Sequence, residues 1–285
     1  MKFSYRSRFL RLYLSLIVII FFSSKAMAQP MWLTPQDGTV ISFEFLKVDK
    51  YKTNPTNLSS VMQFSGRIKV SSQFHLLIEI PFSHFKPDST NQFYYNRVSQ
   101  YMFGNPFIGL EYHNIGDLWL CQLGFRPPLA FSNKDDVDDY ARLANYNKAE
   151  AFTHDVFSIY AKTGIKYSSL SNISYLFLCG PAVVVPTVKV EEDDQSEIYI
   201  DLLAQMYLST PTVRFKAGIS GRYWISAAHE ADGLDERSIH IFGFSADFGS
   251  GKFRPGFQLR FPLDDNLEKL NLKYVWGLHL MVRVD

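Results

Sequence analysis

Apolar and polar residues alternate with a period of two along most of this chain, and that alternation restricts its fold more than any other feature. In 271–284, Trp276, Leu278 and Leu280 share one face, while Gly277 and His279 share the other. Successive side chains point to opposite faces of a β-strand, so this pattern predicts strands with one apolar and one polar face. Helical periodicity is hard to find anywhere in the chain.

Twelve such segments can be recognised, and their connections alternate in length. The expected strands are 39–50, 59–70, 72–87, 103–113, 117–131, 152–167, 173–188, 195–208, 212–226, 237–248, 252–262 and 270–284. Tight turns at 70–72, 114–116, 168–172, 209–211 and 249–251 alternate with longer links at 51–58, 87–102, 132–151, 189–194, 227–236 and 263–269. An even strand number with short turns at one end and long loops at the other is typical of outer-membrane barrels. We therefore predict an all-β, up-and-down antiparallel transmembrane β-barrel of about 12 strands.

The composition of the two faces supports lipid outside the barrel rather than a soluble core. The apolar face is built of Leu, Ile, Val and Phe, with Tyr112, Trp119, Tyr167 and Trp276 near strand ends. Amphipathic rings at strand ends are typical of a membrane interface. The opposite face mixes charged and small residues, which suits a wet lumen. A soluble sandwich with an aromatic core is the alternative.

The first 28 residues have the features of a signal peptide. Four basic residues precede the apolar stretch 12–22, and the segment ends in Ala26-Met27-Ala28. Small residues at this spacing are recognised by signal peptidase. We predict a signal peptide over 1–28, cleavage before Gln29, and an outer-membrane barrel domain over 29–285. The alternative is a retained N-terminal anchor helix.

Charge and cysteine content exclude several classes of protein. The first 28 residues carry five basic residues and no acid, so the remainder has 24 Lys plus Arg against 28 Asp plus Glu, a formal net charge of −4. A mildly acidic chain gives no reason to expect nucleic acid as a partner. Cys121 and Cys179 fall on the lipid face of two strands with one strand between them. Their separation is then about 10 Å, too far for a disulfide.

One short motif resembles a known family. Gly104-Asn105-Pro106-Phe107-Ile108-Gly109-Leu110-Glu111-Tyr112 is similar to a motif of bacterial outer-membrane transporter-like barrels, in particular the outer-membrane proteins linked to phenol-degradation pathways. In that family the motif opens a strand after a surface loop. The resemblance implies the barrel class and says little about the solute.

The expected lumen is basic. By the predicted register the inward cations are Arg67, Lys69, Arg126, Lys162, Lys166, Arg214, Lys216, Arg222, Lys252, Arg254, Arg260, Lys273 and Arg283. The inward acids are Glu44, Glu79, Glu111, Glu197, Asp201 and Asp247. Arg214, Lys216 and Arg222 are expected beside Glu197 and Asp201, whereas Arg254, Arg260 and Lys273 are expected to stay unpaired. Charged rings in a narrow tube select ions by sign.

Twelve strands lie between the filled eight-stranded barrels and the open sixteen-stranded channels. We therefore predict a narrow outer-membrane channel for small solutes that favours anions, with lipid and lipopolysaccharide as its surroundings. The alternatives are a closed structural or adhesive barrel acting through its loops, and an outer-membrane lipid hydrolase. No residue spacing predicts a catalytic site, a metal site or a cofactor.

Three features fit this pattern less simply. Ile239 and Ile241 lie out of phase with Phe242 and Phe244, which predicts a bulge in 237–248. The segment 173–188 is apolar on both faces, which predicts contact with a plug or constriction. Acidic clusters in two long links suggest either solvated loops or binding of divalent cations. These clusters are Asp135, Asp136, Asp138 and Asp139, and Glu191, Glu192, Asp193 and Asp194.

Overall fold

The computed structural model describes most of the chain beyond its first 37 residues. The described residues are 38–49, 59–86, 99–114, 118–132, 135–168, 172–188, 196–225, 238–264 and 272–284. The predicted signal peptide and the acidic cluster at 191–194 lie outside these residues, so both stay predictions.

Strands dominate the described part. They are β1 (Val40–Val48), β2 (Ser60–Lys69), β3 (Phe74–Phe85), β4 (Gln100–Phe103), β5 (Phe107–His113), β6 (Trp119–Arg126), β7 (Phe131–Ser132), β8 (Val156–Ser168), β9 (Ile173–Pro186), β10 (Glu197–Ser209), β11 (Val213–Trp224), β12 (Ser238–Phe248), β13 (Phe253–Pro262) and β14 (Val275–Arg283). An α-helix, α2 (Asp135–Ala144), and a 3-10 segment, η2 (Tyr146–Phe152), lie between β7 and β8. No helix in these ranges is long and apolar enough to cross a bilayer.

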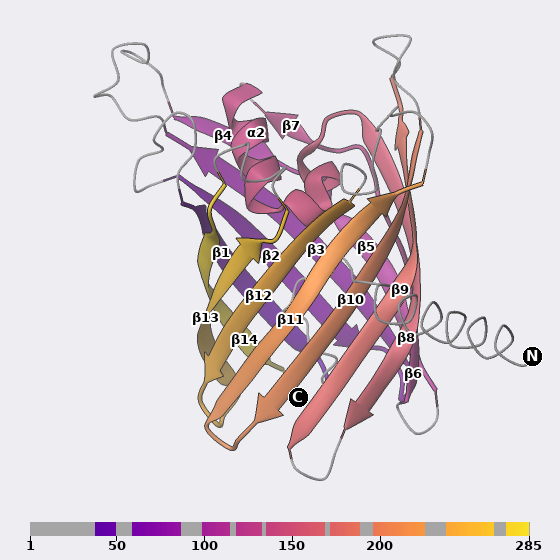
Figure 1. Ribbon diagram of the computed structural model, residues 1–285, viewed down its shortest axis with the longest axis vertical. Helices are drawn as coiled ribbons and strands as arrows, with labels where there is room; N and C mark the ends of the chain where they lie inside the picture. The colour runs from indigo at the N-terminus through magenta and orange to yellow at the C-terminus, as the bar shows by residue number, and fades with distance from the viewer. Residues whose placement is uncertain are drawn as a thin grey trace, which may run out of the picture.

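The strands close into an antiparallel barrel whose wall is twelve strands around, as predicted (Figure 1). The first and last strands pair, with Val40 opposite Arg283, so the sheet closes between β1 and β14. The short strands β4 and β7 continue β5 and β6 beyond the breaks at 104–106 and 127–130. Strand β4 pairs with β3 on one side and with β7 on the other. Because the barrel is closed, the backbone N–H and C=O groups of each wall strand find partners on neighbouring strands, and no strand edge is exposed to lipid.

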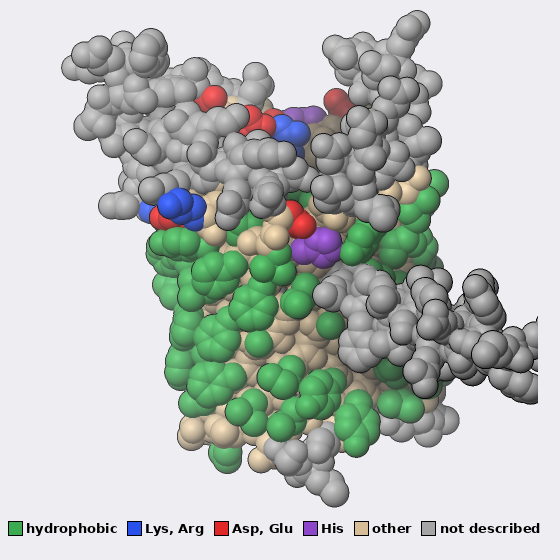
Figure 2. All heavy atoms as spheres, in the orientation of Figure 1, with side chains coloured by type: hydrophobic (Ala, Val, Ile, Leu, Met, Phe, Trp, Pro, Cys, Tyr) green, Lys and Arg blue, Asp and Glu red, His purple; other side chains and the backbone are tan. Residues whose placement is uncertain are grey.

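The two faces divide as the alternation predicted. Leu278 and Phe253 are exposed on the outside, whereas His279 and Gln258 are buried inside. Figure 2 shows hydrophobic side chains covering the wall between the two ends of the barrel. Cys121 and Cys179 are free and are separated by β8, since Thr163 lies opposite each of them. The prediction that they form no disulfide is confirmed.

We call the two ends of the barrel by their connections. The turn end carries the tight connections around residues 70–73, 210–212 and 249–252, and the loop end carries the long ones. Both ends of the described chain, at 38 and 284, lie at the turn end, because Val40 pairs with Arg283.

The link 132–151 is not a surface loop, and here the prediction was wrong. Figure 1 shows α2 and the adjoining segment inside the loop end of the barrel. The helix α2 packs against β1, β2, β3, β4 and β7, and η2 contacts β8 and β11. We call residues 135–152 the plug. The first of the two acidic clusters in the sequence, at 135–139, is consequently part of α2, and Asp138 is buried.

An apolar cluster joins the plug to the inside of the barrel. Val137, Tyr140, Ala141 and Ala144 form one side of α2, at the spacing of a helical face. They are buried with inward residues of the strands, namely Leu46, Val48, Val61, Phe85, Ile239, Ile241 and Val275. Burial of this apolar area is the main non-polar contribution to holding the plug in place.

The structure explains the two strands whose patterns were irregular, and the plug accounts for β12. The β11–β12 register runs unbroken from Val213 opposite Phe248 to Tyr223 opposite Ser238, so the predicted bulge is wrong. Ile239 and Ile241 point inward and are apolar because they contact the plug. In β9, Leu176 and Leu178 are buried in a second inner apolar cluster with Leu203, and no residue of the plug belongs to this cluster. The predicted contact of this strand with a plug is therefore not what makes its inner face apolar.

Candidate functional site: a plugged and charged lumen

Asn105 anchors the end of the plug to the break between β4 and β5. Its side-chain nitrogen donates hydrogen bonds to the carbonyl oxygens of Glu150 (2.9 Å) and Thr153 (2.8 Å). Its side-chain oxygen accepts from the backbone N–H groups of Leu129 and Ala130, both at 2.7 Å. Both polar atoms of the Asn105 amide therefore have hydrogen-bond partners. These bonds connect the chain before the plug, at 129–130, with the chain at its end, at 150–153.

The residue before the anchor must be glycine for steric reasons. A Cβ atom at Gly104 would lie 2.2 Å from the carbonyl oxygen of Ala151. The backbone N–H of Asn105 donates to that same carbonyl at 2.7 Å. The Gly-Asn-Pro motif, which the sequence indicated only as a strand start, thus provides the close contact between plug and wall.

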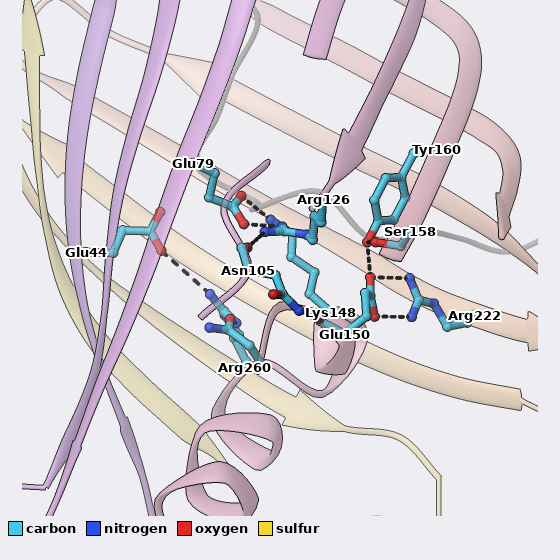
Figure 3. A network of polar contacts seen from close by, with 11 residues as sticks. Glu44, Glu79, Asn105, Arg126, Lys148, Glu150, Ser158, Tyr160, Arg222 and Arg260 are labelled. Atoms are coloured by element: carbon cyan, nitrogen blue, oxygen red, sulfur yellow. Dashed lines mark hydrogen bonds and ion pairs between the residues drawn. The ribbon is translucent and has the colours of Figure 1, made fainter. Parts of the chain in front are cut away.

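Glu79 forms the first ion-pair link between plug and wall (Figure 3). It is buried on β3 and accepts from the Arg126 guanidinium on β6 and from Lys148 of the plug, the latter at 2.5 Å. Arg126 also donates to the Asn105 carbonyl oxygen at 2.8 Å. One buried carboxylate therefore holds two cations, one from the wall and one from the plug.

Glu150 forms the second link, on the opposite side of the lumen. Arg222 of β11 donates to both of its carboxylate oxygens, at 2.7 and 3.1 Å, and the Tyr160 hydroxyl donates to one of them. Arg222 also pairs with Asp201 at 2.8 Å, and Asp201 pairs with Lys162 at 2.9 Å. Figure 3 shows Glu79 and Glu150 on either side of Lys148, so the plug is fixed at two points.

The buried position alters the pKa values of the two plug side chains. Burial raises the pKa of Glu150, but the Arg222 guanidinium more than offsets this and holds it at about 2. Burial lowers the pKa of Lys148 to about 8, even though Glu79 acts in the opposite direction. At neutral pH both groups are charged and paired.

A separate cluster lies nearer the turn end, around Arg67. Its guanidinium lies 2.8 Å from Glu111, 3.1 Å from His75 and 3.0 Å from His113. The ligand atoms of His75, Glu111 and His113 lie within 4.8 Å of one another, which is a metal-like arrangement that the sequence analysis missed. The i, i+2 spacing of Glu111 and His113 on one strand face was its signal. Arg67 already supplies a cation to these groups, so a metal ion would have to displace it.

Asp247 forms the other buried centre near the turn end. It accepts from Lys216 at 2.8 Å and lies 2.6 Å from the Nε2 atom of His279. Lys216 was expected beside the acids of β10, and instead it pairs across to β12. The Cα register places Arg214 directly opposite Asp247.

The predicted lumen residues thus divide into three groups. Paired and buried inside the barrel are Arg67, Arg126, Lys162, Lys216, Arg222, Arg260, Glu111 and Asp201. At the turn end lie Lys69, Lys166, Arg214 and Arg254. At the loop end lie Glu197, which begins β10, and Lys273, which is exposed just before β14.

Arg260 corrects one expectation. It was expected to remain unpaired, but it lies 3.9 Å from Glu44 and donates to the Asn145 side chain of the plug at 3.1 Å. The expected pairing of Arg222 with Asp201 is confirmed. Lys148 and Glu150 were missed because their segment was assigned to a loop, although the spacing of Val137, Tyr140, Ala141 and Ala144 was a helical signal.

Comparisons with known proteins support the fold. No protein-family model and no curated protein matches this sequence. An outer-membrane channel from Pseudomonas putida F1 is similar in structure, with a TM-score of 0.57 and 10% identity over 91% of this chain and 100% of that chain. LpxR from Salmonella typhimurium has a TM-score of 0.48, 8% identity and coverage of 86% and 100%. The translocator domain of autotransporter NalP from Neisseria meningitidis has a TM-score of 0.46, 9% identity and coverage of 89% and 91%. At these identities the first likeness shows the barrel fold, and the other two add nothing to it.

Proposed function

We propose that this protein is an outer-membrane channel for small solutes whose passage depends on displacement of the plug. The turn end faces the periplasm and the loop end faces the cell exterior. The observation that carries the proposal is how the plug is held. Residues 135–152 belong to no strand of the wall. They are attached to the wall by the side chains of Asn105, Glu79 and Arg222.

The size of the barrel and its structural neighbour are consistent with this role. Twelve strands enclose a lumen wider than the side-chain-filled interior of eight-stranded barrels. The outer-membrane channel from Pseudomonas putida is covered completely by this chain. The resemblance of 104–112 to transporter-like barrels supports the same class of protein and leaves the solute to be argued from the lumen.

We further propose that the open channel favours anions. Most inward charges in the middle of the barrel are neutralised in ion pairs, so they contribute little net charge to the lumen. The described cations at the turn end are in excess of the acids there, since Glu111 and Asp247 are already engaged. Charges at a low-dielectric mouth select permeant ions by sign.

A closed structural barrel is the second candidate, because the buried pairs Arg67–Glu111 and Lys216–Asp247 are what a permanently filled interior would contain. Substitution Asn105→Ala distinguishes the two. It removes all the side-chain hydrogen bonds of Asn105, and both backbone carbonyl and backbone N–H groups lose their partner, at about 1–3 kcal/mol for each unsatisfied group. We expect the plug to loosen and conductance in planar bilayers to rise, with reversal potentials indicating anions.

The matched control is Asn114→Ala, which removes a 2.6 Å bond from the Trp119 backbone N–H at the turn end and leaves the plug alone. Trypsin provides an independent readout, because Lys148 is buried and becomes cleavable only when the plug leaves the lumen. Cleavage at Lys148 without conductance would reject the channel and favour the structural barrel.

A further inference from the structure

A pocket with a strongly basic lining opens at the turn end of the lumen. It has a volume of about 340 Å³ and lies between the ends of β11, β13 and β14 and the turn that precedes β13. Four of its lining residues are cations, namely Arg214, Lys252, Arg254 and Arg283, and among the described residues no acid lines it. This volume is at the small end of the range for pockets that hold small molecules.

The clearest sign of a missing anion comes from Arg214. Its Nη1 atom is buried and has no hydrogen-bond partner among the described residues. The acid opposite it in the register, Asp247, is engaged with Lys216 and His279. A buried guanidinium nitrogen without an acceptor is costly, and an anion in the pocket would supply that acceptor.

The position of the pocket shows from which side an anion reaches it. Phe215 and Phe253 are exposed on the outer wall. Because successive residues of a strand point to opposite faces, their neighbours Arg214 and Arg254 lie on the inner face. A lipid headgroup outside the barrel would have to cross the sheet to reach the guanidinium groups. The pocket is therefore accessible to a soluble anion, which reaches it from the periplasm or from the lumen.

The lining also indicates what kind of anion fits. Several cations from separate strands and a turn suit a molecule that carries more than one negative group, and arginine binds carboxylate and phosphate in a two-pronged manner. Val40 and Met281 supply apolar surface beside the charges. A carbon skeleton would contact this surface, which a bare inorganic ion would not do.

We propose that this pocket is a binding site for a small organic anion with two or more carboxylate or phosphate groups. The inference rests on the proposed anion preference and gives that preference a defined place at the periplasmic mouth. Binding in the pocket does not require an open channel, because the plug lies at the other end of the barrel.

Isothermal titration of the full-length protein in detergent, with citrate as the probe in a metal-free and chloride-free buffer, tests the proposal. We expect saturable binding that Arg254→Gln weakens at least tenfold, and that Arg214→Gln weakens in the same direction. The matched control is Lys69→Gln, which removes one cation at the same end outside the pocket. It should change the affinity less than twofold. Acetate, with a single carboxylate, should bind at least tenfold more weakly than citrate.

Each result decides the matter. Absence of citrate binding, or equal weakening by Arg254→Gln and Lys69→Gln, would overturn the site, the second because it would reveal only a diffuse positive field. Binding without conductance in any variant would reject the channel while leaving the site standing. Conductance without binding would do the reverse.

Discussion

Two buried carboxylates, Glu79 near the loop end and Asp247 near the turn end, show how the two halves of this lumen differ. Each accepts from two basic side chains. Both partners of Asp247 belong to the barrel wall, whereas one partner of Glu79, Lys148, belongs to the plug. The same kind of ion pair therefore joins wall strands to one another in one half of the lumen and joins the plug to the wall in the other half.

The surroundings of the two carboxylates differ in the same way. The loop-end half holds an apolar cluster made jointly by plug and wall. The turn-end half holds charged clusters around Arg67 and Asp247, together with a basic pocket. A buried ion pair adds little stability compared with apolar packing, although removing one partner is costly. The halves should consequently respond alike in stability and differently in conductance.

The largest effect is expected from neutralising these carboxylates one at a time. Glu79→Gln and Asp247→Asn each leave two buried basic groups without their acid, at about 3–5 kcal/mol. Urea unfolding in lipid vesicles should show a similar loss for both variants. Only Glu79→Gln should raise conductance and expose Lys148 to trypsin, because only Glu79 holds the plug.

The control for that comparison is Asp139→Asn, on the exposed side of α2. Asp139 pairs with Arg142 at 2.6 Å, but 62% of the Asp139 side chain and 41% of the Arg142 side chain are exposed. Surface pairs contribute roughly 0–1 kcal/mol. If Asp139→Asn opened the channel as much as Glu79→Gln, the plug would not be held by the buried contacts.

A charge on the outer wall should disturb insertion according to its depth in the bilayer and not according to the chemistry of the lumen behind it. Leu278 and Val284 lie on the outer face with 55% and 53% of their surface exposed, one in the middle of β14 and one just past its end. Leu278→Arg should disturb insertion by about 2–4 kcal/mol and Val284→Arg by about 0–1 kcal/mol. The ratio of folded to unfolded protein on unboiled gels measures this. Equal tolerance at the two positions would contradict the assigned lipid face.

The docking of the plug should depend on pH, and this dependence is expected only outside the neutral range. The pKa of Glu150 is about 2 when docked, below its ordinary value of 4.5. Docking therefore gains stability that is fully present above pH 4.5 and is lost as pH falls toward 2, by about 1.4 kcal/mol per pH unit. The pKa of Lys148 is about 8 when docked, against 10.5 ordinarily, so docking strengthens further as pH rises from 8 to 10.5.

Conductance should accordingly rise below pH 4.5 and fall above pH 8. Glu150→Gln should remove the acid limb without changing the alkaline one, and Lys148→Gln should do the opposite. Arg222 keeps its second partner, Asp201, in the first variant, which limits damage to the wall. An acid limb that persists in Glu150→Gln would assign it to another carboxylate.

The sequence by itself determined the wall of this protein. A period-2 pattern places every second residue on the same face, and loop length divides the two ends, so strand number, lipid face, free cysteines and the inward position of Arg67, Arg126 and Arg222 followed without tertiary information. Only the tertiary structure decided what fills the lumen. Lys148 and Glu150 meet Glu79 and Arg222 across 69 and 72 residues of chain, and no local pattern encodes such a contact. The inward apolar residues Ile239 and Ile241 resembled a register error for the same reason, because the segment that covers them comes from a distant part of the chain.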